Sequence, residues 1–129
     1  MLKTLKISNK KITIDDLDIY SHVKKYNYVT LNELKIYEIP EVYFCGVTGR
    51  LTVYLQKGQI YKLGFLVVNS LNVFGISSNF NAYNTFLAEM EENYRQQSET
   101  EFYNKRFFFK IIKDDNNFMV IVRGRSLCG

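Results

Sequence analysis

Hydrophobic residues recur along this chain at two spacings, and the spacings predict which segments are helices and which are strands. A first helix is predicted from about residue 14 to 26, with Thr13 as its N-cap and the acidic pair Asp15 and Asp16 at the positive end of its dipole. Its apolar side consists of Leu17, Tyr20 and Val23.

A second helix is predicted over residues 80–97, because its apolar residues keep a strict spacing of three and four. Ser78 or Asn79 is the expected N-cap. The segment before the cap, residues 69–75, is ambiguous between a loop and a short strand around Val73. The apolar stripe of the helix, which we expect to pack on the sheet, is Tyr83, Phe86, Leu87, Met90 and Tyr94.

Alternation of apolar and polar residues predicts several strands. Residues 2–7 form a short first strand, and residues 34–39 form a second, which ends or lies at a sheet edge at Pro40 because proline cannot donate to a ladder. Residues 42–47 are a continuous apolar run, and Gly46 and Gly49 flank a turn.

A tight hairpin is predicted where residues 50–56 and 59–67 are joined by Lys57 and Gly58 alone. A two-residue connection pairs Leu55 with Ile60 and Tyr54 with Tyr61, and a bulge at Gly58 would shift these pairs by one.

A second hairpin of high aromatic content closes the chain, with strands at 102–113 and 118–123 around a turn at 114–117. The alternation separates two faces. One is apolar and predicted to be core: Phe107, Phe109, Ile111, Val120 and Val122. The other mixes apolar and cationic side chains: Arg106, Phe108, Lys110, Ile112, Met119, Ile121, Arg123 and Arg125.

These elements together predict an α+β fold. We expect a single domain spanning residues 1–129, with a curved, mainly antiparallel sheet of five to seven strands and two helices packed on one face. Short connections favour antiparallel neighbours over βαβ units.

Composition places the chain among ordinary globular proteins, with 47% hydrophobic and 23% charged residues, a single proline and seven glycines. The net charge of +4 is modest, and the cations are interleaved with acidic residues. A nucleic-acid-binding protein usually concentrates its lysines and arginines on one face. Charge alone therefore does not select a class of partner.

Cysteine usage and hydropathy bear on location. Cys45 and Cys128 are far apart, and such a pair more often stays reduced, which favours the cytoplasm. The first eleven residues carry four lysines and lack the apolar core of a signal peptide, and no stretch reaches the about 20 apolar residues of a membrane span. We expect a soluble cytoplasmic protein that does not act at a membrane.

Catalytic chemistry has little support in the sequence. His22 is the only histidine, and we interpret it as a surface or boundary residue rather than a general base. Asp15, Asp16 and Asp18 lack the glycine and the final glutamate of a calcium loop. Residues 45–50 have two glycines but no Gly-Lys-Ser/Thr ending, so they indicate a strand turn rather than a phosphate loop. Cys128 is one residue from the terminus, where a nucleophile is rarely held rigidly.

We therefore expect a protein that is not an enzyme and that uses no metal or cofactor. The best candidate site is the mixed face of the last hairpin, where aromatic residues, methionine and arginine are typical of a protein interface. The residues expected to bind a partner are Arg106, Phe108, Lys110, Met119, Ile121, Arg123 and Arg125.

The expected function is inhibition by occlusion, most economically as an immunity or antitoxin-like protein that covers an acidic surface of a bacterial toxin. Such inhibitors are small and need no chemistry of their own. Two alternatives stay open. The same hairpin could bind single-stranded nucleic acid, with Phe108 stacking on a base. A ligand-binding domain or enzyme could instead use an aromatic pocket formed by Tyr54, Tyr61, Tyr83 and Tyr94.

Overall fold

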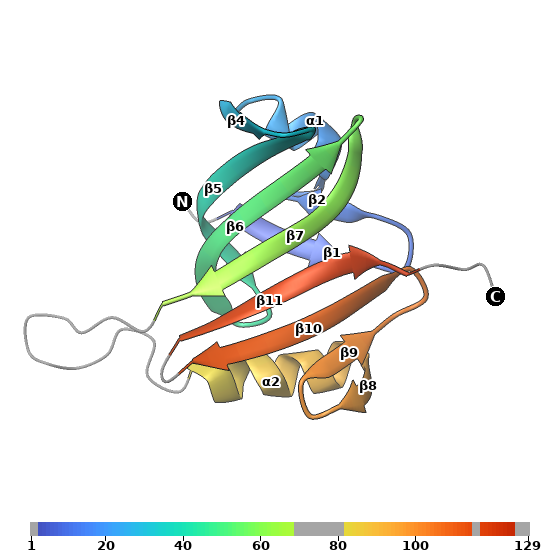
Figure 1. The fold of residues 1–129 in the computed structure, drawn as a ribbon. Coiled ribbons are helices and arrows are strands. Elements are labelled where there is room, and N and C mark those ends of the chain that lie inside the picture. The colour runs from blue at the N-terminus through green and yellow to red at the C-terminus, as the bar shows by residue number, and fades with distance from the viewer. Residues whose placement is uncertain (1–2, 69–81, 115–116, 126–129) are drawn as a thin grey trace, which may run out of the picture.

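In a computed structural model of the chain, one eleven-stranded sheet curls around a helix (Figure 1). The structure describes residues 3–68, 82–114 and 117–125. The strands are β1 (Lys3–Ile7), β2 (Ile12–Ile14), β3 (Leu17–Asp18), β4 (Tyr28–Leu31), β5 (Leu34–Phe44), β6 (Val47–Gln56), β7 (Gln59–Val67), β8 (Arg95–Ser98), β9 (Glu101–Tyr103), β10 (Phe107–Asp114) and β11 (Asn117–Gly124). The helices are α1 (Ile19–Val23) and α2 (Ala82–Asn93).

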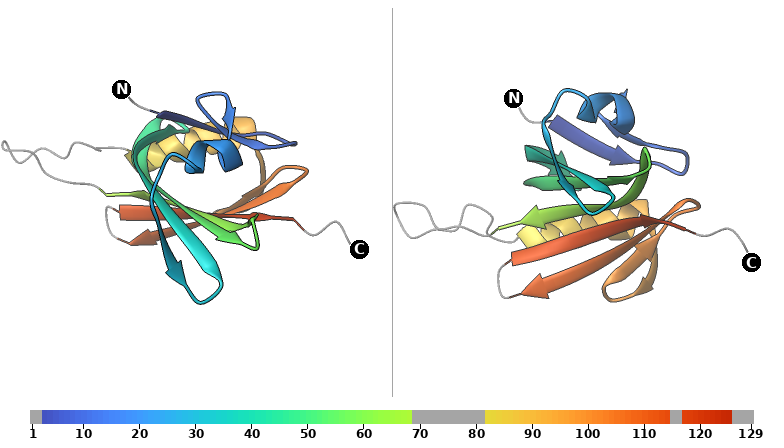
Figure 2. Two further views of the ribbon diagram at one scale, coloured as in Figure 1. Left: turned by 90° about the horizontal axis from the view of Figure 1, so that it is seen from above. Right: turned by 45° about the horizontal axis from the view of Figure 1, so that its top comes forward.

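The strand order is β3-β2-β1-β5-β6-β7-β11-β10-β9-β8, and β4 pairs with β5 off this path. Every pair is antiparallel except β1 with β5, which is parallel. The views in Figure 2 show the sheet bent around α2. We call the face toward α2 the inner face and the opposite one the outer face.

This architecture corrects the predicted fold class. The expected α+β sheet of five to seven strands is wrong: 62% of the described residues are in strands, 16% are helical, and the sheet is mixed and has eleven strands. The missed strands are short, and a strand of two to four residues leaves almost no periodic signal. Pairing with a neighbouring strand, and not local pattern, makes these segments extended.

The first predicted helix is helical in its middle only: residues 14–18 are strand and turn, and residues 24–26 are turn and bend. Only Ile19–Val23 is helical, and its N-cap is Asp18, whose Oδ1 accepts a hydrogen bond from the Tyr20 backbone N–H at 2.9 Å. The buried side of α1 consists of Ile19, His22 and Val23. Of the predicted apolar side, Val23 is therefore correct and Leu17 and Tyr20 are wrong.

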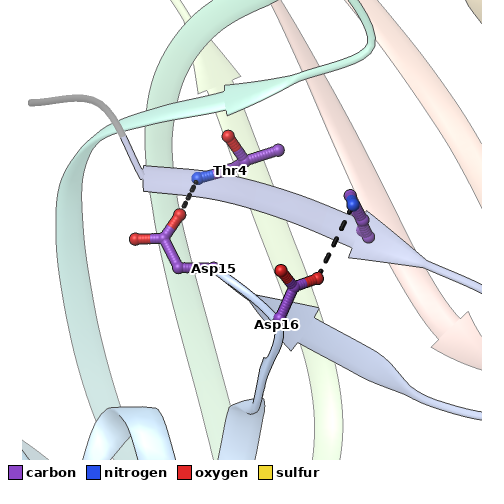
Figure 3. Close-up of polar contacts among 4 residues, drawn as sticks. Thr4, Asp15 and Asp16 are labelled. Carbon is purple, nitrogen blue, oxygen red and sulfur yellow. Dashed lines mark hydrogen bonds and ion pairs between the residues drawn. The ribbon is translucent and has the colours of Figure 1, made fainter.

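Asp15 and Asp16 are not helix-start residues but a two-residue turn between β2 and β3, with φ of 52° and 65°. Figure 3 shows the Asp15 carboxylate turned toward β1, where its Oδ1 accepts a hydrogen bond from the Thr4 N–H at 2.8 Å. The backbone N–H of Asp15 donates to the Thr4 carbonyl at 2.9 Å, and Asp16 lies 3.6 Å from the Lys6 ammonium. Both acids therefore fasten this turn to β1.

Pro40 does not end its strand, contrary to the prediction. β5 continues to Phe44, and the pairing with β6 passes from Ile39 opposite Leu51 to Val42 opposite Gly49, which leaves one extra residue on β5. Glu41 has a φ of 55° at this bulge. A bulge accommodates the missing proline donor because its extra residue is unpaired in any case. It also separates the part of β5 that pairs with β4 from the part that pairs with β1.

The predicted hairpin of β6 and β7 is confirmed. Lys57 and Gly58 both have positive φ, which matches the twist of a two-residue hairpin turn. Leu55 pairs with Ile60 as predicted, whereas a bulge pairs Tyr54 with Lys62 instead of Tyr61.

The turn predicted between Gly46 and Gly49 is misplaced, because the chain turns at Cys45–Gly46, between β5 and β6. Gly49, by contrast, lies inside β6. A Cβ there would stand 2.5 Å from the Leu66 carbonyl oxygen of β7, so only glycine fits this close approach.

The second predicted helix is confirmed in its position but is shorter. The helix covers Ala82–Asn93, and residues 95–98 form β8 rather than its last turn. The predicted caps Ser78 and Asn79 and the segment 69–75 lie outside the described residues. Phe86 and Met90 are fully buried, and the rest of the predicted stripe packs against the core. The ring of Phe86 contacts those of Phe44, Phe65 and Phe118, which join α2 to the sheet.

The hairpin of β10 and β11 is confirmed, from Phe107 opposite Gly124 to Asp114 opposite Asn117. The predicted strand 102–113 is wrong in its first part, because Glu101–Tyr103 forms the separate strand β9, which folds back on β10. All five residues of the hairpin's predicted core face are buried: Phe107, Phe109, Ile111, Val120 and Val122. The opposite face therefore points away from the core, as the alternation requires.

Candidate functional site

The outer face of the last hairpin carries five of the seven residues that the sequence assigns to partner binding. Phe108, Met119 and Ile121 are half-buried, and Lys110 and Arg123 are exposed. Their neighbour Ile112 is 46% exposed. Because Phe86 of α2 packs on Phe118 from the inner side, α2 does not cover this face.

The same surface continues onto β7 and β6, which the sequence did not reveal. Ile112 lies opposite Met119, Met119 opposite Leu66 of β7, and Leu66 opposite Arg50 of β6. The β7–β11 pairing joins strands that are distant in the sequence, and no local pattern encodes it. We call this surface the outer patch: an apolar centre of Leu66, Phe108, Ile112, Met119 and Ile121, with Arg50, Lys62, Lys110 and Arg123 around it.

An opening lies in the middle of the outer patch at Gly64. This residue is half-buried and pairs with Ile121 on one side and Thr52 on the other. A Cβ built at Gly64 would have no atom within 4 Å. A glycine inside a central strand often marks close approach of another molecule to the backbone, and the space above this one is open.

The cations of the outer patch are not in ion pairs with the described residues. Among those residues, the only pair of opposite charges within 4.0 Å is Lys6 with Asp16. Lys110 faces Glu101 across β10 and β9, and Arg123 stands 6.0 Å from the ring centroid of Tyr61. The patch therefore presents positive charge that a partner can neutralise.

Arg106 and Arg125, the other two predicted binding residues, contact the chain itself. Arg106 Nη1 donates a hydrogen bond to the Lys10 carbonyl at 2.6 Å, across 96 residues of sequence. Arg125 Nη1 donates to the Asn104 carbonyl at 2.7 Å, and its guanidinium lies 4.8 Å over the Tyr103 ring. Arg106 thus fastens the β1–β2 turn to the β9–β10 loop, and Arg125 holds that loop in place.

The four tyrosines of the alternative pocket do not converge. Tyr61 is 46% exposed, and Lys62 lies over the Tyr54 ring at 4.8 Å. Tyr83 packs edge-on against Phe118, and the Tyr94 hydroxyl donates a hydrogen bond to the Ile7 carbonyl at 2.9 Å.

A separate cavity of about 500 Å³ lies between β1, the β5–β6 turn and the end of α2. Its wall includes Cys45, Glu89, Tyr94 and three asparagines, Asn9, Asn93 and Asn104. Burial, reinforced by Glu89, raises the pKa of Cys45 to about 12, and its Sγ lies 3.7 Å from Met90 Sδ. Burial also raises the pKa of Tyr94, with Cys45 adding to it. Both groups stay protonated near neutral pH, so neither is an activated nucleophile.

His22 is buried, not at the surface or boundary as predicted, with 4% of its surface exposed. Its Nε2 stands 3.4 Å from the Tyr26 hydroxyl, and within the described part of the chain Nδ1 has no hydrogen-bond partner. Burial lowers the pKa of His22, and Lys25 lowers it further. A neutral imidazole enclosed by the core has no access to a substrate proton.

The predicted turn at residues 45–50 leads into strand β6 and not into a helix, so it lacks the N-terminal amides of a phosphate cradle. Cys128 lies outside the described residues.

Comparisons with known proteins add no relative. Searches of protein-family models, of curated proteins and of solved structures each found no match to this chain. Within the described residues, neither helix has the length and apolar character that crossing a membrane requires.

Proposed function

We propose that this protein works by binding an acidic surface of another protein on its outer patch. The observation that carries the proposal is the contiguous row of Leu66, Met119 and Ile112 beside the open position at Gly64, with cations around it that are not in ion pairs. Apolar groups at the centre and charges at the rim are the arrangement of a specific protein interface.

The expected contributions of centre and rim differ. Burying Met119, Ile121 and Phe108 under a partner removes apolar surface from water and supplies most of the affinity. Lys110 and Arg123 accelerate association with an acidic partner and exclude basic ones.

The biochemical role that we propose for this binding is inhibition by occlusion. The proposed partner is a bacterial toxin domain, and the chain would then be an immunity or antitoxin-like protein. The role requires only a surface that covers a functional site. The raised pKa of Cys45 and the enclosure of His22 agree with it, because neither group is available for catalysis.

The decisive experiment reverses two rim charges. In Lys110→Glu/Arg123→Glu, affinity for the protein partner falls by at least about tenfold, equivalent to 1.4 kcal/mol. Both side chains are exposed, so circular dichroism stays unchanged. The unfolding midpoint falls slightly, because the glutamate at position 110 stands opposite Glu101 of β9. Calorimetric titration measures the affinity.

The matched control is Lys24→Glu/Lys57→Glu, which makes the same charge change at exposed residues away from the outer patch. It retains the affinity of the original chain. An equal loss in both variants would show a general effect of net charge and would remove the outer patch as the interface.

Binding of single-stranded nucleic acid is less well supported. The tyrosine rings on and beside this face have cations of the same chain against them: Lys62 at Tyr54, Arg123 at Tyr61 and Arg125 at Tyr103. A ring with a cation against it has less surface free to stack on a base, and Phe108, the predicted stacking residue, is half-buried. Titration of a fluorescent oligonucleotide at low salt tests this, and tight binding that weakens steeply with salt would favour nucleic acid over protein.

A further inference from the structure

Strand β4 is a free edge of the sheet. β6 occupies one side of β5, while β4 and β1 share the other side, β4 along Leu34–Tyr37 and β1 at Val42 and Tyr43. Within the described residues, no strand pairs with the far side of β4. Figure 1 shows β4 at one extremity of the sheet. Because hydrogen-bonded and non-hydrogen-bonded pairs alternate in an antiparallel ladder, part of its backbone N–H and C=O groups point away from β5.

The strands at the two ends of the main path are protected and β4 is not. β8 is polar and begins with Arg95, and β3 has only two residues, one of them Asp18. β4 carries no charge, and all four of its residues are exposed: Tyr28, Val29, Thr30 and Leu31. Val29 is 69% exposed and Leu31 58%, more than any other large apolar side chain in the described residues. Proteins usually protect such an edge with charges or by shortening it.

Charge at the two ends of β4 indicates which strand fits there. The exposed Lys24 and Lys25 precede β4, and the exposed Glu33 follows it. When β4 pairs antiparallel with a second β4, the lysine end of each copy meets the Glu33 end of the other. Both contacts of the two-fold pair are then attractive, and Val29 lies near Leu31 of the second copy. The Lys35 ammonium of β5, 4.8 Å over the Tyr28 ring, lies on the other face of β4 from Val29 and Leu31.

We propose that two copies of this chain associate through antiparallel pairing of β4 with β4, which forms a closed two-fold dimer with a continuous sheet. The contact uses the free edge of each copy, so it does not propagate. It is separate from the outer patch, and each copy keeps its own patch available.

Sedimentation equilibrium of the full chain tests the proposal. The expected mass is that of two 15.2 kDa chains. Val29→Lys/Leu31→Lys raises the dimer dissociation constant by at least about tenfold, because it places charges on the edge. Circular dichroism shows that the variant is folded. Tyr43→Lys is the matched control, since Tyr43 is 40% exposed and pairs with Thr4 of β1 on one side and Thr48 of β6 on the other, and this variant remains a dimer.

A charge exchange tests the antiparallel register. Glu33→Lys alone and Lys24→Glu/Lys25→Glu alone each weaken self-association by about tenfold, because both contacts become repulsive. Mixing the two variants restores a dimer, since both contacts between unlike chains are attractive. A monomer at every concentration up to about 1 mM, a mass above two chains, equal loss in Tyr43→Lys, or no recovery on mixing would each overturn the proposal.

Discussion

The two faces of the last hairpin are built from alternate residues of the same strands, yet their surroundings differ completely. Phe109 and Val120 on the inner face have no exposed surface, whereas Lys110 and Ile112, each next to an inner residue in the sequence, are exposed. Both faces contain large apolar side chains. The difference teaches that in this protein hydrophobicity alone does not mark the core, and that cations between the apolar residues mark the face that stays outside.

The largest effect is expected at the inner face. Phe109→Ala lowers the free energy of unfolding by about 3–5 kcal/mol, because it empties a fully buried site whose ring lies 4.4 Å from that of Tyr94. Urea unfolding followed by circular dichroism measures the loss.

The matched change on the outer face is Phe108→Ala, which costs no more than about 1–2 kcal/mol because Phe108 is only half-buried. Equal losses in the two variants would mean that the outer face is as much a part of the core as the inner one.

A smaller effect, with opposite signs for stability and binding, is expected at Gly64. Gly64→Val adds a β-branched residue where nothing lies within 4 Å, so it raises the free energy of unfolding by about 0.5–1 kcal/mol. The new side chain fills the opening in the outer patch and lowers partner affinity by about tenfold, or 1.4 kcal/mol. Thermal unfolding and calorimetric titration measure the two quantities.

Thr52→Val is the control for this change, because it places the same side chain next to Gly64 at a residue that already has a Cβ. Affinity that is unaffected by Gly64→Val would show that no partner approaches this opening.

The smallest effect is a pH dependence of the folding stability, which comes from the buried His22. Burial, Lys25 and Lys3 lower the pKa of His22, with Asp15 acting in the opposite direction. The unfolded chain therefore binds a proton more readily at this residue. The contribution of neutral His22 to stability is complete above its pKa in the unfolded chain, about 6.5. It is lost as pH falls through the lower pKa of His22 in the folded protein.

Unfolding midpoints measured in steps from pH 8 to pH 5 test this, with His22→Leu as the comparison. The variant loses less stability over this range than the original chain. Parallel curves for the two proteins would assign the acid sensitivity to other groups.

The sequence predicted those elements whose partners are close in the chain. The two-residue connection at Lys57–Gly58 and the alternation around residues 114–117 were sufficient for the β6–β7 and β10–β11 hairpins, and the stripe from Tyr83 to Tyr94 was sufficient for α2. The hairpin of β5 and β6 was not predicted, because Pro40 interrupts the pattern of β5. The prediction also failed at residues 14–26, where the helical spacing of Leu17, Tyr20 and Val23 competed with a turn that Asp15 fastens to Thr4. A hydrogen bond to another strand overrode the local preference.

Only part of the candidate site could be predicted, because the sequence reveals contacts between neighbouring strands of one hairpin but not between distant strands. Alternation placed Phe108, Met119 and Ile121 on one face, since this needs only the hairpin register. It could not place Leu66 and Gly64 beside them, because that depends on β7 pairing with β11. It also assigned Arg106 to a partner, although the guanidinium donates to the Lys10 carbonyl.

The amino-acid pattern by itself determined the turns of the β6–β7 and β10–β11 hairpins, which side chains of β10 and β11 lie on the same face, and which face of α2 is apolar. Only the tertiary structure decided the strand order, the parallel pairing of β1 with β5, the free edge at β4 and the extent of the outer patch. The physical reason is range: turn conformation and side-chain alternation depend on neighbouring residues, whereas strand order depends on which distant strands bury the most apolar surface together.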